Sequence, residues 1–145
     1  MPIPVWILLG FAAWTLLILF ATVGAYRWSH ILTGRTALSA WRADEQQGSE
    51  WYRRAMRAHV NCLENLPVYT AIVVAALSAR MTDPMLDGLA IGFLVARIGQ
   101  SSIHVMVEQT NTIVGIRFAL FLVQVVCMVA MGSLVAHGSM HEGKI

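Results

Sequence analysis

Residues 53–67, RRAMRAHVNCLENLP, place arginines, amides and a carboxylate directly before an apolar segment. A helix advances about 100° per residue, so four of these side chains fall on one face: Arg53, Arg57, Asn61 and Glu64. Guanidinium groups bind carboxylates in bidentate geometry, and a carboxylate pairs with an ammonium group. The pattern therefore predicts a site for a charged, polar ligand.

The apolar segment that follows, Leu66 to Ala79, is shorter than the roughly 20 residues that a membrane-spanning helix needs. If this helix spans, its polar start lies partly inside the bilayer. A charged group there costs on the order of 2.5 to 3.5 kcal/mol, so such groups face a protein interior and have partners. Those partners are either other side chains of the protein or a bound ligand.

The composition identifies a membrane protein, because 57% of the 145 residues are hydrophobic and only 12% are charged. The net charge of +2 is small and the basic residues are gathered in one region, which excludes a nucleic-acid-binding surface. Cys62 and Cys127 form neither a disulfide framework nor a metal-ligand spacing. We expect no metal, and we expect both cysteines to fill space in the interior.

Four apolar segments predict four membrane-spanning helices in a single domain over residues 1–145, at about residues 5–26, 50–80, 84–107 and 113–136. Ser49 and Asp83 are expected to cap the second and third helices, and Pro84 suits the first helical position. Residues 27–50 are expected to form a loop and the tail after the fourth span to fray. The predicted fold is an all-α integral membrane four-helix bundle.

The orientation in the membrane follows from six arginines in the first loop and the start of the second span: Arg27, Arg35, Arg42, Arg53, Arg54 and Arg57. Basic residues concentrate in cytoplasmic loops, so this side is expected to face the cytoplasm. With four spans, both termini then lie on the non-cytoplasmic side.

Two further spans carry polar residues within the membrane. On the third span five of them follow one helical face: Arg97, Gln100, Ser101, His104 and Glu108. The fourth span contributes Arg117 and Gln124. At about 1.5 Å per residue, five of the polar residues lie about 20 to 30 Å from the outer ends of their helices, in one layer: Asn61, Glu64, Arg97, His104 and Arg117. The sequence thus predicts a polar pocket with excess positive charge, which suits a ligand that has carboxylates for the arginines and an ammonium group for Glu64.

Residues 57–67, RAHVNCLENLP, resemble the second-helix signature of the MAPEG family, the membrane-associated proteins of eicosanoid and glutathione metabolism. The four spans and the chain length agree with that family. The resemblance implies a homotrimer that binds glutathione between neighbouring subunits near the cytoplasmic face. It assigns glutathione binding to Arg57, Asn61, Glu64 and Arg97, and we predict six glutathione-binding residues in all by adding two from the polar face of the third span: Arg57, Asn61, Glu64, Arg97, Gln100 and His104. Of these, Gln100 and His104 stand where family enzymes often carry tyrosines.

Arg117 is the best match for the fourth-helix arginine that holds the glutathione thiolate, and we predict it to be catalytic. A free thiol titrates near pH 8.5, and a close cation favours the thiolate, which is the nucleophile. Attack on a lipophilic electrophile arriving from the bilayer gives a thioether, and a hydroperoxide is reduced instead. The resemblance therefore implies a membrane-bound glutathione transferase with possible peroxidase activity, using glutathione as co-substrate.

Several alternatives stay open from the sequence. A non-catalytic lipid-binding or scaffold protein of the same fold would keep the trimer and lose the thiol chemistry. The loop-one arginine that joins the site in some family members is either Arg27 or Arg35. His104 either donates to the thiolate or pairs with Glu108. The expected location is a bacterial inner membrane, or the endoplasmic reticulum in a eukaryote.

Overall fold

The computed structural model describes residues 1–41 and 48–142, with side chains as far as Met140, so the predicted loop arginine Arg42 lies outside the described residues. The helices in chain order are α1 (Ile3–Ile18), the π-helical turn η1 (Leu19–Gly24), α2 (Ala25–Leu32), the 3₁₀ turn η2 (Leu38–Ala40), α3 (Glu50–Ser78), α4 (Pro84–Met106) and α5 (Asn111–Glu142). Because α1, η1 and α2 follow without a break, they form one long helix.

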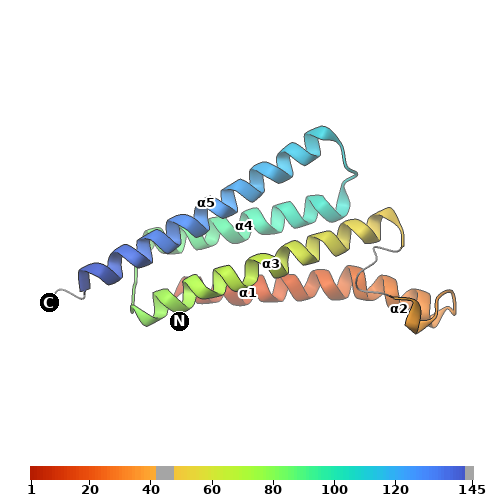
Figure 1. Ribbon diagram of the computed structural model, residues 1–145, viewed down its shortest axis with the longest axis horizontal. Coiled ribbons are helices and arrows are strands. Elements are labelled where there is room, and N and C mark those ends of the chain that lie inside the picture. The colour runs from red at the N-terminus through yellow and green to blue at the C-terminus, as the bar shows by residue number, and fades with distance from the viewer. Residues whose placement is uncertain (42–47, 143–145) are drawn as a thin grey trace.

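Four helices are long and apolar enough to cross a membrane: Ile3–Leu32, Glu50–Ser78, Pro84–Met106 and Asn111–Met140. They lie side by side, with the amino terminus and the α3–α4 turn at one end of the bundle and the α4–α5 connection at the other (Figure 1). Figure 1 also shows α5 inclined to the other helices. The predicted all-α four-helix architecture is confirmed.

The first spanning helix continues to Leu32, so the predicted end at Tyr26 and the predicted loop over residues 27–50 were wrong in their boundary. The helix ends where Gly34 takes a φ of +68°, in the left-handed region that glycine adopts without steric cost. The N–H groups of Gly34 and Arg35 donate to carbonyls of the last helical turn, which is the Schellman arrangement.

The carboxyl ends of α3 and α5 also differ from the prediction. Helix α3 ends at Ser78 instead of residue 80, because Arg80 takes the left-handed position with a φ of +48°. Helix α5 continues to Glu142 instead of ending near residue 136 in a frayed tail. Its last turns pack against the α3–α4 turn, where a Cβ at Gly138 would lie 3.4 Å from the Met81 sulfur.

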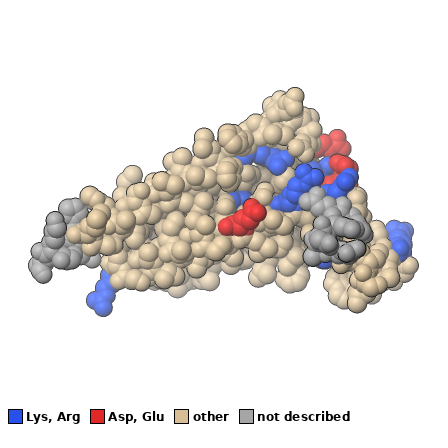
Figure 2. All heavy atoms as spheres, viewed as in Figure 1, with Lys and Arg blue, Asp and Glu red and all other residues tan. Residues whose placement is uncertain are grey.

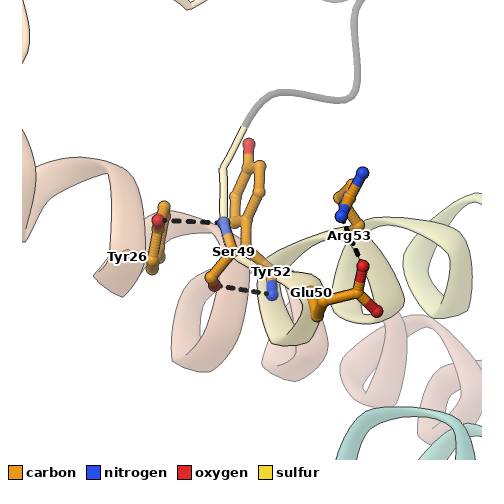
Figure 3. A network of polar contacts seen from close by, with 5 residues as sticks. All are labelled: Tyr26, Ser49, Glu50, Tyr52 and Arg53. Carbon is orange, nitrogen blue, oxygen red and sulfur yellow. Dashed lines mark hydrogen bonds and ion pairs between the residues drawn. The ribbon is translucent and has the colours of Figure 1, made fainter.

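The start of α3 is fixed by hydrogen bonds to the end of the first spanning helix (Figure 3). The Ser49 hydroxyl accepts the Tyr52 N–H at 3.2 Å, which confirms the predicted N-cap, and the Ser49 N–H donates to the Tyr26 hydroxyl at 3.2 Å. Gly48 precedes the cap with a φ of +110° and faces both tyrosine rings. Asp83 caps α4 in the same way, accepting from the Met85 N–H at 2.8 Å.

The hydrophobic core lies between α1, α3, α4 and α5, and three aromatic rings form its centre. Tyr69 stacks on Phe93 with ring centroids 4.6 Å apart, and Phe11 meets both rings edge-on. Cys62 and Cys127 are free, buried members of this core, as expected for small apolar residues. Cys62 and Phe93 of this core lie on the same helices as the polar residues Asn61 and Arg97. Packing of the core therefore fixes the positions of the helices that carry the polar residues.

Candidate functional site

A cavity of about 250 Å³ opens between α3, α4 and α5. Asn61, Glu64 and Asn65 line it from α3, at helical spacings that share one face. The lining contributed by α4 and α5 consists of Arg97, Gln100, Val114, Arg117, Phe118 and Phe121. The structure therefore brings five predicted site residues from three helices around one space: Asn61, Glu64, Arg97, Gln100 and Arg117.

Positive charge gathers on the same part of the molecule. Figure 2 shows Lys and Arg atoms concentrated at the end that carries the start of α3 and the α4–α5 connection, and extending into the region between α3 and α5. Two arginines and one glutamate line the cavity, which gives its described walls a net positive charge. A site of this charge in a low-dielectric surrounding attracts anions.

A network of amides and a guanidinium closes the floor of the cavity. Arg97 Nη1 donates to Gln100 Oε1 at 3.0 Å, and Gln124 Nε2 donates to the same oxygen at 3.1 Å. Gln100 Nε2 donates in turn to the backbone carbonyl oxygen of Arg117 at 3.0 Å. The network therefore ties α4 to α5 at the level of the cavity and fixes the orientation of Gln100.

Arg97 is the most deeply buried charge in the described chain, with only 1% of its surface exposed. Its Nε and Nη2 atoms have no hydrogen-bond partner among the described residues. Glu64 is close enough for the opposite charges to attract, but the two form no ion pair in the described structure. Buried cations are normally paired. Arg97 therefore brings an incompletely hydrogen-bonded cation to the wall of the cavity, which favours an anionic ligand there.

Arg117 is held by a histidine. Its Nη2 atom lies 3.0 Å from Nε2 of His104, a side chain that is 3% exposed and does not line the cavity. A guanidinium can only donate hydrogen bonds, so His104 accepts through Nε2 and carries its proton on Nδ1. The sequence had offered the thiolate or Glu108 as the partner of His104, and the structure provides Arg117 instead.

Arg53 and Arg57 diverge from the cavity although the helical wheel placed them on the face of Asn61 and Glu64. Arg53 pairs with Glu50 one turn earlier on the exposed start of α3. Arg57 is exposed and absent from the cavity lining, although its charge acts on Arg117. The polar face of α3 therefore contributes directly to the cavity only in its deeper half.

The two candidate arginines of the first loop differ in their surroundings. Arg27 Nε donates to the Tyr52 hydroxyl at 2.6 Å, and its guanidinium carbon lies 5.6 Å from the centre of the Trp41 ring. These contacts hold Arg27 in an aromatic cluster. Arg35 is exposed after the end of α2. Between the two, Arg35 is therefore the residue free to reach a ligand or a neighbouring molecule.

Sequence reasoning missed the apolar wall of the cavity. Phe118 and Phe121 carried no signal that distinguishes them from lipid-facing residues. Gln124, which the sequence had placed among the polar residues of the fourth span, does not line the cavity and contributes through its hydrogen bond to Gln100. Asn65, directly after Glu64 on α3, also lines the cavity.

The fold and the cavity define a multi-pass integral membrane protein with a polar, positively charged site between its second, third and fourth spans. The chain belongs to the MAPEG family, whose family model matches residues 4–137 of the 145 residues. This match spans all four membrane helices. No curated protein and no solved structure matches the chain significantly, so the assignment stands at the level of the family.

Proposed function

We propose that the protein is a membrane-bound glutathione transferase that activates glutathione as a thiolate for attack on lipophilic electrophiles. The observation that carries this proposal is the buried Arg97, whose Nε and Nη2 donors lack partners beside a cavity that also contains Arg117 and Glu64. Glutathione has carboxylates for the guanidinium groups and an ammonium group for Glu64. Asn61 and Gln100 add amide groups for its peptide bonds.

Arg117 is the catalytic residue in this proposal. Its guanidinium lowers the pKa of the bound glutathione thiol, because a cation within about 4–6 Å favours the anion. The thiolate sulfur then attacks a carbon of the electrophile, a carbon–sulfur bond forms, and the leaving group departs with the bonding electron pair. With a hydroperoxide, the thiolate sulfur attacks the terminal oxygen, the O–O bond breaks, and the alkoxide takes up a proton and leaves as an alcohol. The glutathione sulfenic acid that remains reacts with a second glutathione to give the disulfide and water.

A neighbouring subunit would complete the site. The cavity volume of about 250 Å³ lies just below the usual range of about 300–1,000 Å³ for small-molecule pockets. Three of its lining residues, Val114, Phe118 and Phe121, are 40%, 64% and 41% exposed in the single chain. A homotrimer, as the family resemblance implies, would cover this open wall. The exposed Arg35 is then our candidate for the arginine that a subunit lends to its neighbour.

The arginine-rich end of the bundle is proposed to face the cytoplasm, with both termini on the opposite side. Glutathione is a cytoplasmic thiol, so this orientation would let it enter from the polar end, while an apolar substrate would enter from the bilayer. The proposed location is a bacterial inner membrane, or the endoplasmic reticulum if the host is a eukaryote.

A second candidate function is a non-catalytic lipid-binding or scaffold protein of the same fold. Phe118 and Phe121 favour it, because they form an exposed apolar wall of the cavity beside Arg117. This candidate retains the apolar ligand and dispenses with glutathione. The unsatisfied Arg97 favours the transferase over it.

Isothermal titration of glutathione into the detergent-solubilised protein distinguishes the two functions. A transferase gives saturable binding, whereas the absence of heat together with no competition by glutathione analogues identifies the scaffold. In conjugation assays with a chlorinated dinitrobenzene, Arg117→Ala is expected to lower kcat at pH 7 about 10- to 30-fold with a much smaller change in the glutathione Kd. This range corresponds to a thiol pKa restored from about 6.5–7.5 to about 8.5.

The pH profile gives the second test of Arg117. The cation keeps the pKa of the bound thiol low, so in Arg117→Ala the thiolate forms only as the pH rises toward about 8.5. The deficit in kcat should therefore shrink above pH 8.5. Arg80→Ala, an exposed arginine at the other end of α3, is the matched control. A deficit in Arg117→Ala that is equal at all pH values, or equal losses in kcat and binding, would mean that Arg117 only binds glutathione.

A further inference from the structure

We propose that His104 is a positioning residue that holds the Arg117 guanidinium at the cavity, a role that rests on the proposed thiolate function of Arg117. The contact is direct, because Arg117 Nη2 donates to His104 Nε2 at 3.0 Å. His104 is buried on α4 and is absent from the cavity lining. It therefore touches the arginine without being placed to touch a ligand.

Helix α4 holds Arg117 at two points. Gln100 Nε2 donates to the Arg117 backbone carbonyl at 3.0 Å, while His104 accepts from its side chain. Gln100 and His104 are four residues apart, so they lie one above the other on the same helical face. A free arginine side chain has about 2 kcal/mol of rotamer entropy. The hydrogen bonds to the backbone carbonyl and to the guanidinium of Arg117 together favour one conformation of its side chain.

The surroundings of His104 explain why an acceptor is needed there. Arg57 on α3 and Arg117 on α5 act electrostatically on one another and on His104, and Arg54 of α3 also acts on the histidine. No carboxylate hydrogen-bonds or ion-pairs with Arg117 in the described part of the chain. A neutral imidazole supplies the one acceptor in this cationic group. Without it, Arg117 would be free to move away from Arg57 and from the cavity.

Position matters because the effect of a cation on a thiol falls with distance. At an effective dielectric constant of about 20, moving a unit charge from about 4 Å to about 6 Å from the sulfur raises the pKa of the thiol by about one unit. For a bound thiol with a pKa near 7, this lowers the thiolate fraction at pH 7 about fivefold, so we expect kcat of His104→Leu at pH 7 to fall about fivefold. The Kd of glutathione should change less than about threefold, because the residues of the cavity floor remain.

His104→Gln is the conservative variant, because its side-chain oxygen is an acceptor near the position of Nε2. It should restore kcat to within about threefold of the unmodified protein and restore the ultraviolet absorbance of bound thiolate that His104→Leu loses. His59→Leu is the matched control, since His59 is also a buried histidine, with no hydrogen bond to Arg117 and no place in the cavity lining. Thermal melting in detergent identifies any variant that fails to fold.

A double-mutant cycle tests whether His104 acts through Arg117. In an Arg117→Ala background, His104→Leu should lower kcat no further, because the group that it positions is gone. Additive losses in the cycle, or the same kcat in His104→Leu as in the unmodified protein, would overturn the inference. So would a His104→Gln variant as impaired as His104→Leu.

Chemical labelling separates this inference from the proposed function, because it needs no glutathione. The rate at which a dicarbonyl reagent modifies Arg117, followed by mass spectrometry, should rise several-fold in His104→Leu, while labelling of the exposed Arg80 stays constant. An unchanged rate at Arg117 overturns the positioning role even if the protein proves to be a transferase. A raised rate in a protein that binds no glutathione supports the positioning contact and rejects only the proposed function.

Discussion

Replacing Arg97 by methionine should separate what stabilises the bundle from what binds the ligand. Arg97 is buried to 1% exposure, and two of its three guanidinium nitrogens have no partner in the described structure. Methionine has a similar length and no charge to desolvate. In Arg97→Met, Gln100 Oε1 loses the hydrogen bond from Arg97 but still accepts one from Gln124 Nε2, so this oxygen is not left without a partner. The substitution therefore removes an uncompensated buried charge and exposes no new unpaired group in this network.

The expected magnitude follows from what buried charges cost. Replacing buried ionic groups by well-packed apolar residues of similar volume often stabilises proteins by about 1–4 kcal/mol. Arg97→Met also loses its hydrogen bond to Gln100, so we expect a gain in the lower part of this range, about 1–2 kcal/mol. For a chain of this size, that raises the melting temperature by about 2–8 °C. Glutathione binding should weaken at least about 30-fold, as expected when one partner of a buried charge pair is removed.

The assay is thermal melting in detergent, with and without glutathione. Glutathione should raise the melting temperature of the unmodified protein, by an amount that grows with the logarithm of 1 + [glutathione]/Kd, and at the same concentration raise that of Arg97→Met much less. Arg80→Met, at an exposed arginine, controls for a general effect of added methionine. A ligand-free Arg97→Met that melts several degrees below the unmodified protein would refute the reasoning, because Arg97 would then be satisfied by the protein alone.

Three further substitutions test other contacts. Glu64→Gln removes the proposed partner of the glutathione ammonium and should weaken binding about 3- to 30-fold by titration, with unchanged affinity showing that Glu64 serves only the protein. Gly48→Ala should lower the melting temperature in detergent by the equivalent of about 1–3 kcal/mol, because φ is +110° and the new Cβ would lie 2.9 Å from Tyr52 Cδ1; an unchanged value would mean that the segment before α3 shifts without cost. Tyr52→Phe leaves Arg27 Nε without its acceptor and should destabilise by about 1–3 kcal/mol, which an unaltered melting curve would contradict.

The existence and order of the membrane helices were predictable, because long apolar segments and the absence of competing structures in a bilayer leave few alternatives. The caps Ser49 and Asp83 were also predictable from local chemistry, and both are confirmed. The helix ends were harder. The left-handed residue that ends α3 is Arg80, which no sequence rule would select over a glycine. The extension of α5 depends on packing of Gly138 against Met81, a contact between distant parts of the chain.

The sequence predicted which helical faces carry the site residues and how deep in the membrane these residues lie. It did not predict the individual contacts between them. Helical periodicity brought Asn61, Glu64 and Arg97 to one layer, and the structure places all three around the cavity. Periodicity cannot say how a flexible arginine turns, so it did not distinguish the exposed Arg57 from the cavity-lining Arg117. Such choices depend on which acceptor lies nearby, and that is a property of two helices together.

The cavity has two chemically different walls, and this contrast is the main physical argument for a two-substrate reaction. On one side are guanidinium and amide groups that are already hydrogen-bonded to one another, so they need little rearrangement to receive an anion. On the other side are the apolar rings of Phe118 and Phe121, both exposed in the single chain. Because apolar surroundings lower the effective dielectric constant, a cation at the boundary between these walls acts on a thiol more strongly than it would in solution. Arg117 stands at that boundary, between the amide network and the phenylalanines on its own helix, where a thiolate and an apolar electrophile would meet.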